Sequence, residues 1–185
     1  MYFAFARNSF EFILKNIGFF NKEFIALPDY NCDAVFQPLY DLNINFKLYS
    51  VNDDFSPDWE SIYKIQDDGM KAMLVVNYFG QPQQIREYRK YCDEKKIYMI
   101  EDNSHSYGGT YKKKMLGSYG DFSFSSPRKI IKTPMGSILT NNSDLFLNFN
   151  LPNKRAKLNI KKILFYNLLN FSPMFREKIK NVIKK

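Results

Sequence analysis

The segment YMIEDNSHSYGG, residues 98–109, contains the single histidine of the 185-residue chain and places it just after two acids, Glu101 and Asp102. A carboxylate, serines and an imidazole together raise the question of Ser-His-Asp catalysis. However, Asp102 and His105 lie three residues apart in an expected loop with no nucleophile elbow nearby, which argues against a hydrolase. One histidine and two isolated cysteines give no metal-ligand spacing. Glycine fingerprints for dinucleotides or a P-loop are absent after the expected strands.

A second segment, GDFSFSSPRKIIKTPMGS at residues 120–137, favours a different chemistry. Without it, Asp102 would be interpreted as a turn cap and His105 as an ordinary loop residue. The segment places a serine cluster and then Lys129 in a short loop before another apolar stretch. A carboxylate at one strand end and a lysine at another are two groups that a pyridoxal phosphate site needs.

Each requirement of such a site has a candidate residue. Lys129 would form the Schiff base, and the charge of the neighbouring Arg128 would favour its unprotonated amine. Asp102 would keep the pyridine nitrogen protonated, so that the ring withdraws electrons. The phosphate would be bound by the hydroxyls of Ser125 and Ser126 and by the N-terminal amides of the first expected helix.

These residues must be positioned by alternating strands and helices. The pattern predicts a helix over Asn8–Ile17 with Gly18 as its stop, and a helix over 56–65 with Ser56 as its cap and Pro57 at its first position. Further helices are expected over 32–40 and 82–96, and strands over 24–28, 44–50, 71–80, 97–102, 120–126 and 136–141. Such alternation predicts an α/β fold, a mostly parallel sheet between helical layers, with ligands at the carboxyl ends of the strands.

Composition and charge restrict the function classes. With 45% hydrophobic and 17% aromatic residues, the chain is expected to fold around a core. The net charge is +8, but 10 of the 27 basic residues and 1 of the 19 acidic residues lie beyond residue 150. A neutral body with a basic tail does not indicate a nucleic-acid-binding protein. Neither a secretory signal nor a membrane-spanning run is recognised, so a cytoplasmic location is expected.

Residues 5–142 resemble the DegT/StrS-type sugar aminotransferases, which are fold-type-I pyridoxal phosphate enzymes. The similar segments are ARNSFEFILKNIGF (6–19), residues 23–54, AMLVVNYFGQPQQI (72–85) and, most specifically, IYMIEDNSHSYGGTYKKKMLGSYGDFSFSS (97–126). The resemblance implies the three-layer α/β/α large domain of that family, with pyridoxal 5'-phosphate as cofactor. It also implies a homodimer, a nucleotide-linked keto sugar as amino acceptor and glutamate as amino donor.

The resemblance assigns roles to particular residues. Asp102 takes the place of the residue that binds the pyridine nitrogen, and His105 that of a Gln or His beside the ring. Lys129, seven residues before Gly136, matches the Schiff-base lysine. Lys129 and Asp102 are thus the expected catalytic pair. The cofactor-binding set implied by the resemblance is Arg7, Asn8, Cys32, Asp102, His105, Ser125, Ser126 and Lys129.

Three positions depart from the family pattern. Phe124 stands five residues before the lysine, where the phosphate-binding serine usually falls, so Ser125 or Ser126 would take over its role. The glycine pair is replaced by Gly136 and Ser137. Cys32 stands where many members have an aromatic residue that stacks on the cofactor.

Two regions are expected: a cofactor-binding large domain over 1–150 and a basic helical tail over 151–185. The chain ends where the family continues into a small C-terminal domain, which is therefore expected to be missing. The tail is interpreted either as the start of that domain or as a segment that binds a partner or a membrane surface.

The main hypothesis is a transaminase of nucleotide-sugar and surface polysaccharide biosynthesis that works through Lys129. One alternative is a truncated, inactive family member that binds the cofactor or acts as an interaction module. Another is a different cofactor chemistry on the same scaffold, such as dehydration, although retention of Lys129 favours amino transfer. The third is a basic, membrane-associated binding protein.

Overall fold

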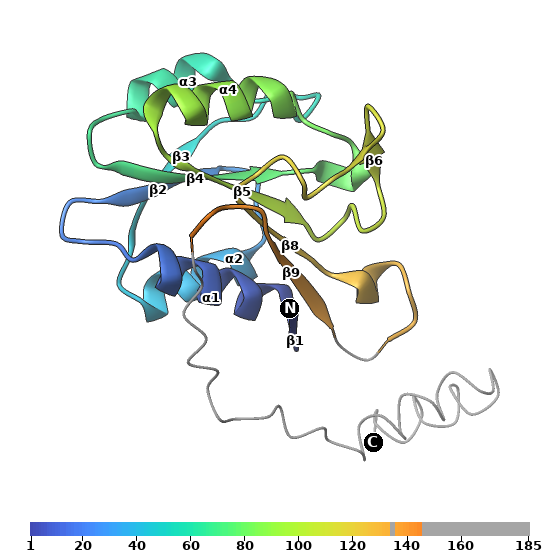
Figure 1. The fold of residues 1–185 in the computed structure, drawn as a ribbon. Helices are drawn as coiled ribbons and strands as arrows, with labels where there is room; N and C mark the ends of the chain where they lie inside the picture. Colours follow the sequence, from blue (N-terminus) through green and yellow to red (C-terminus); the bar gives the residue numbers. More distant parts are fainter. Residues whose placement is uncertain (134–135, 146–185) are drawn as a thin grey trace, which may run out of the picture. The chain divides into compact units, whose positions relative to one another are not determined.

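A seven-stranded sheet lies at the centre of the computed structural model, which describes residues 1–133 and 136–145 (Figure 1). The strand order is β1-β9-β8-β5-β4-β2-β3. Strands β2, β3, β4, β5 and β8 run parallel, whereas β9 is antiparallel to β8 and β1 is antiparallel to β9. The strand bounds are β1 Tyr2–Phe3, β2 Phe24–Pro28, β3 Asn45–Tyr49, β4 Met70–Val76, β5 Tyr98–Asn103, β8 Phe122–Ser125 and β9 Ser137–Asn141.

Helices cover both faces of this sheet, which confirms the expected three-layer α/β/α architecture (Figure 1). Helices α1 (Ala6–Ile17) and α2 (Asp33–Asp41) lie on one face, and α3 (Trp59–Ile65) and α4 (Ile85–Lys95) lie on the other. Single 3₁₀ turns follow two of the strands, η1 at Tyr78–Gly80 and η2 at Pro127–Lys129. The strands β6 (Thr110–Tyr111) and β7 (Lys114–Met115) form a separate hairpin.

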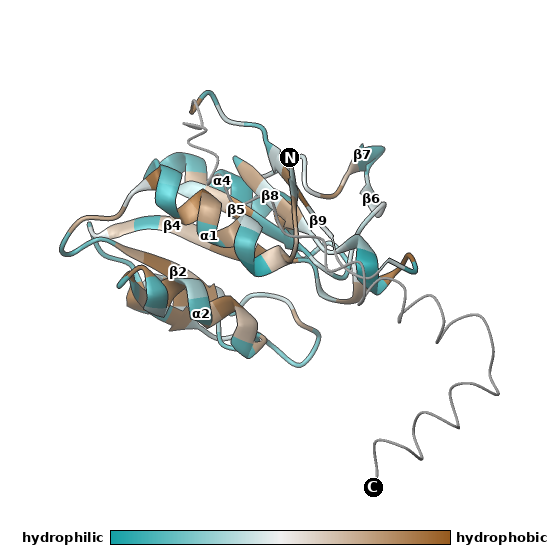
Figure 2. Ribbon diagram, turned by 90° about the horizontal axis from the view of Figure 1, so that it is seen from below, coloured by the Kyte–Doolittle hydropathy of each residue, from teal (hydrophilic) through white to brown (hydrophobic). Residues whose placement is uncertain are grey.

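The central strands are buried on both faces, as their unbroken apolar sequences predict. All five residues of β2 are buried, and Figure 2 shows hydrophobic residues along it. One core cluster, which includes Phe10, Leu27 and Leu74, packs beneath α1 and α2. A second cluster, which includes Met73 and Tyr88, packs beneath α3 and α4. The two helical layers therefore fix the sheet from both sides.

Most expected elements are present, with corrections at their ends. The first helix begins at Ala6 rather than Asn8. The cap of α3 is Asp58 and not Ser56, because the Asp58 carboxylate accepts from the Glu60 N–H at 3.0 Å. Ser56 instead closes a turn, its carbonyl accepting from the Asn52 N–H at 2.8 Å. Strands β1, β6 and β7 were not predicted, since two residues are too few to show a period.

The predicted boundary near residue 150 and the basic tail lie outside the described residues, so both stay predictions. Within the described part of the chain, the helices are too short or too polar to cross a membrane.

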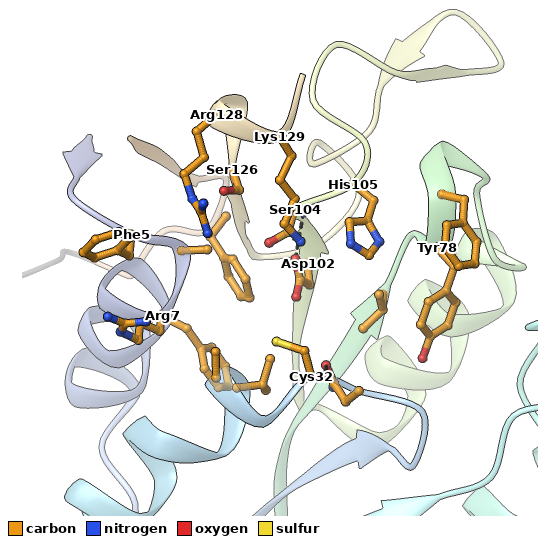
Figure 3. Close-up of a pocket in the computed structure, with 18 of the residues that line it drawn as sticks. Phe5, Arg7, Cys32, Tyr78, Asp102, Ser104, His105, Ser126, Arg128 and Lys129 are labelled. Atoms are coloured by element: carbon orange, nitrogen blue, oxygen red, sulfur yellow. Dashed lines mark hydrogen bonds between the residues drawn. The ribbon is translucent and has the colours of Figure 1, made fainter. Parts of the chain in front are cut away.

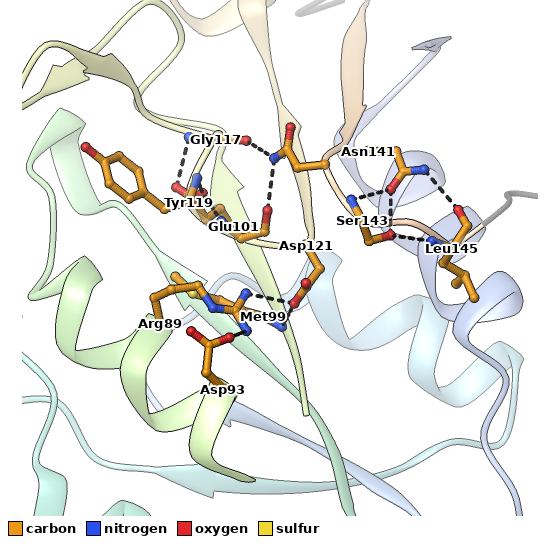
Figure 4. A network of polar contacts seen from close by, with 12 residues as sticks. Arg89, Asp93, Met99, Glu101, Gly117, Tyr119, Asp121, Asn141, Ser143 and Leu145 are labelled. Atoms are coloured by element: carbon orange, nitrogen blue, oxygen red, sulfur yellow. Dashed lines mark hydrogen bonds and ion pairs between the residues drawn. The ribbon is translucent and has the colours of Figure 1, made fainter. Parts of the chain in front are cut away.

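A buried carboxylate joins the sheet to the loop that precedes β8 (Figure 4). Glu101 is fully buried, and its Oε1 accepts from the N–H groups of Tyr119 at 2.7 Å and Gly120 at 2.6 Å. Its Oε2 accepts from the Gly117 N–H at 2.8 Å and from Asn77 Nδ2 at 3.2 Å. Burial raises the pKa of Glu101, and these four donors oppose that shift. The carboxylate thus supplies the acceptors that this loop lacks internally.

We expect Glu101→Gln to lower the free energy of unfolding by about 3 kcal/mol, because the new amide turns donors toward donors and leaves buried N–H groups unpaired. Urea denaturation of both proteins measures this difference. The matched control is Glu87→Gln on the exposed side of α4, which should change stability by less than about 0.5 kcal/mol. Equal effects at the two positions would contradict the assignment of Glu101 as the loop anchor.

Candidate active site

A pocket of about 320 Å³ opens at the carboxyl ends of the central parallel strands (Figure 3). Its walls come from the segments that follow β2, β4, β5 and β8, and from the N-terminal ends of α1 and α2. This is the position that a parallel α/β sheet favours for ligands, because the loops after parallel strands converge there. The lining residues are Phe5, Ala6, Arg7, Phe10, Tyr30, Asn31, Cys32, Ala34, Val35, Val76, Tyr78, Phe79, Asp102, Ser104, His105, Phe124, Ser126, Arg128 and Lys129.

Six of the eight residues in the expected cofactor-binding set line this pocket, and Asn8 and Ser125 do not. Asn8 is the third residue of α1, and its N–H donates to the Phe5 carbonyl at 2.9 Å. The Ser125 hydroxyl belongs to β8 and donates to the Ile138 carbonyl of β9 at 3.4 Å. Of the two serines that the sequence left open, Ser126 therefore lies in the pocket.

The two neighbouring acids of β5 point to opposite faces of the sheet, because side chains alternate along a strand. Glu101 faces the loop before β8, whereas Asp102 lines the pocket on the α1 and α2 side. Asp102 is 6% exposed, and its Oδ1 accepts from the Ser104 N–H at 2.8 Å. Burial raises the pKa of Asp102, and the bond from Ser104 and the positive charge of Lys129 oppose that shift. A protonated ring nitrogen beside this carboxylate would reduce the cost of its burial.

His105 stands beside Asp102 and stacks on an aromatic ring. Its imidazole lies parallel to the Phe79 ring, with centroids 5.7 Å apart and an interplanar angle of 9°. Burial and the charge of Lys129 lower the pKa of His105, while Asp102 opposes them. The imidazole is therefore held mainly neutral near pH 7, able to donate or accept one hydrogen bond. Phe79 adopts a φ of 52°, a left-handed conformation that a non-glycine residue rarely takes.

Two polar atoms of the pocket lack a protein partner. The Ser126 hydroxyl is buried, at 1% exposure of the residue, and has no hydrogen-bond partner among the described residues. The same holds for Asn31 Nδ2. A buried polar group without a partner costs free energy, so its presence in a pocket favours a ligand that completes the bond. The donor set thus fits a cofactor that carries a phosphate and a polar ring.

The pocket is also predominantly cationic. Arg7, Arg128 and Lys129 line it, and Asp102 is the single acid among its described lining residues. An anionic ligand would balance this charge.

Several lining residues were not found from the sequence. Phe5, Tyr78 and Phe79 enter the pocket from the segments before α1 and after β4. Aromatic residues at these places read as ordinary core or turn residues in the sequence. The signal that came closest was the turn segment NYFGQP, which was recognised as similar to the family and not as part of a site.

The fold and the pocket define a large domain of the kind found in pyridoxal-phosphate-dependent aminotransferases. Solved aminotransferases share this fold: Helicobacter pylori PseC, which takes part in pseudaminic acid biosynthesis, aligns with a TM-score of 0.71 at 21% identity, over 78% of this chain and 40% of that chain. The aminotransferase from Psychrobacter cryohalolentis aligns with a TM-score of 0.70 at 18% identity, over 78% and 38%. The chain belongs to the DegT/DnrJ/EryC1/StrS aminotransferase family, whose sequence model matches residues 10–151.

Two of the similar proteins carry the names of different enzymes. The chain is 29% identical over 127 residues to a GDP-4-keto-6-deoxy-D-mannose 3-dehydratase from Escherichia coli O55:H7, covering 66% of this chain and 32% of the relative. It is 35% identical over 80 residues to the GDP-perosamine synthase of Vibrio cholerae, covering 42% and 22%. The chain therefore spans about a third or less of these relatives' length.

The single histidine allows the electrostatics of the pocket to be measured directly. We expect Lys129→Gln to raise the pKa of His105, because it removes a positive charge that disfavours the imidazolium. Asp102→Asn should lower the pKa of His105, because it removes the opposing negative charge. Titration of the imidazole resonances by NMR gives both shifts without overlap from other histidines.

The matched control for this titration is Lys90→Gln on the exposed side of α4, which should leave the histidine pKa unchanged. A histidine pKa that does not respond to Lys129→Gln would show that the lysine ammonium does not face His105.

Proposed function

We propose that this chain carries the cofactor-binding site of a pyridoxal-phosphate-dependent aminotransferase that moves an amino group from glutamate to a nucleotide-linked keto sugar. The observation that supports this most is the convergence of Lys129, Asp102 and the partnerless Ser126 hydroxyl in one pocket. Family membership supports the same chemistry, and one relative, Bacillus subtilis EpsN, is described as a putative pyridoxal phosphate-dependent aminotransferase. A cytoplasmic homodimer remains part of the proposal.

Pyridoxal phosphate, when bound, supplies an aldehyde that condenses with amines and a ring that withdraws electrons from the adjacent carbon. Asp102 would hold a proton on the ring nitrogen, since its buried carboxylate makes no ion pair among the described residues. Lys129 Nζ would anchor the cofactor and, once displaced by the amino donor, would take and return the proton at the donor α-carbon.

His105 and Cys32 would orient the ring. The Phe79 stack fixes the plane of the imidazole, so a neutral His105 can offer one hydrogen bond to the cofactor. Cys32 is the N-cap residue of α2 and lines the pocket below Asp102 in the view of Figure 3. A cysteine offers less stacking surface than an aromatic ring, so His105 would carry more of the orientation.

A second candidate function is dehydration of the sugar, because one relative with 29% identity is a GDP-4-keto-6-deoxy-D-mannose 3-dehydratase. Retention of Lys129 favours amino transfer over dehydration. A third candidate is a module that binds the cofactor but catalyses no reaction. Incubation of the cofactor-loaded protein with glutamate tests the third candidate, because a non-catalytic module would not release 2-oxoglutarate. Addition of a nucleotide-linked keto sugar then tests the second candidate. Loss of the sugar 3-hydroxyl, without an amine in the product, would identify the dehydratase.

The cofactor site is tested by covalent trapping. Wild-type protein mixed with pyridoxal phosphate should show the visible absorbance band of a lysine-bound cofactor, and borohydride should fix the label on the peptide that contains Lys129. Lys129→Ala should lose both signals. The matched control is Lys132→Ala, an exposed lysine three residues later, which should still be labelled. Labelling that persists in Lys129→Ala, or is absent from wild type, would contradict the assignment.

The two cysteines provide an independent footprint. Cys32 is exposed and lines the pocket, whereas Cys92 is buried in α4 and burial raises the pKa of its thiol to about 12. Pyridoxal phosphate should slow the reaction of Cys32 with a thiol reagent, because the bound ligand blocks access. Cys92 should react only after denaturation. A fast reaction of Cys32 that is unaffected by saturating cofactor would place the ligand elsewhere.

A further inference from the structure

Arg128 is a cation without an acidic partner at the mouth of the pocket. In the described part of the chain, its guanidinium makes no ion pair or hydrogen bond, and it lies against the Phe5 ring, 5.9 Å from Cζ to the ring centroid. By contrast, Arg89 pairs with Asp121 and Asp93, each at 2.8 Å. The family resemblance assigns no role to the side chain at this position. An arginine that lines a pocket with all its donors free is available to a ligand.

The ring that Arg128 approaches belongs to Phe5, the N-cap residue of α1, and the Arg7 guanidinium lies over the same ring, with Cζ 4.6 Å from its centroid. No side chain caps the helix, and its first turn contains no acid. The first N–H groups of a helix have no partner within the helix, and they carry partial positive charge. This end of α1 therefore lacks the negative charge that commonly stabilises a helix start.

The second observation is the partnerless hydroxyl of Ser126, two residues before Arg128. Ser126 is 1% exposed, lines the same pocket and has no hydrogen-bond partner among the described residues. Figure 3 shows Ser126, Arg128 and Lys129 entering the pocket side by side from one segment, with Phe5 on the far side of Arg128. A helix terminus, a free guanidinium and a buried hydroxyl are together the donors that a phosphate dianion requires.

Ser126 and the N-terminus of α1 are already the expected phosphate ligands. We propose that the Arg128 side chain joins them and binds the phosphate group of the ligand that Lys129 anchors. This inference rests on the proposed function. The guanidinium supplies parallel N–H donors and a full charge, which a phosphate dianion accepts better than neutral hydroxyls do. It takes over part of the binding that Phe124 cannot provide at the position where the family has its serine. Arg128 and Lys129 are neighbours in the chain. One small ligand could therefore place its phosphate at Arg128 and its aldehyde at Lys129.

The test compares two ligands that differ only in the phosphate. Dissociation constants of pyridoxal phosphate and pyridoxal are measured by absorbance titration for wild type and Arg128→Gln. The preference for the phosphorylated ligand should fall about 10- to 100-fold in Arg128→Gln, the effect of losing a charged hydrogen bond. Arg128→Lys should retain part of the preference. The matched control, Arg86→Gln on the exposed side of α4, should retain all of it.

A second measurement separates this inference from the proposed function. Inorganic phosphate alone should raise the melting temperature of wild type and of Arg86→Gln, but not of Arg128→Gln. Should wild type fail to bind pyridoxal phosphate while this pattern holds, the phosphate subsite stands and the proposed function fails. An unchanged ligand preference in a folded Arg128→Gln variant would overturn the inference alone. The inference would also be overturned if a nucleoside diphosphate displaced bound inorganic phosphate and pyridoxal phosphate did not.

Discussion

The parallel register of β4, β5 and β8 is the constraint on which the pocket depends. Val76 lies opposite Asp102, and Asp102 lies opposite Phe124, so three strands end on one line and their following loops open on one side. The register is fixed because each strand is buried on both faces. A slip of β5 by one residue would move the Asp102 carboxylate to the opposite face of the sheet. Two helical layers therefore determine where the chemistry is placed.

The alternation of side chains along β5 separates two acids that are adjacent in the sequence. Glu101 meets four donors and closes a structural network, whereas Asp102 faces the pocket and accepts from the Ser104 N–H. The first carboxylate is satisfied by the protein, and the second retains acceptor capacity for a ligand. The same division recurs at the serines, since Ser125 bonds to β9 and Ser126 remains without a partner in the described chain.

The pocket carries features that cost stability in the free protein. A buried hydroxyl without a partner, a buried carboxylate and a left-handed Phe79 are each unfavourable, and such features gather at functional sites. A ligand that binds only the folded state would offset them through linkage. The covered core around β2 and β4 provides the stability that allows this local cost. The strand ends thus carry the pocket, whereas the middle of the sheet carries the stabilising core.

The sequence by itself determined the strand and helix alternation and the layer architecture, because the hydrophobic period carries that information. Residue types and order proposed Asp102 and Lys129, the family resemblance added His105, and all three line the pocket. The sequence could not choose between Ser125 and Ser126, nor exclude Asn8, because each choice depends on where a strand or helix ends to within one residue. It also missed Phe5 and Phe79, whose roles follow from contacts between distant segments. Only the tertiary structure decided these points, since side-chain direction at a strand end is set by packing against neighbouring elements.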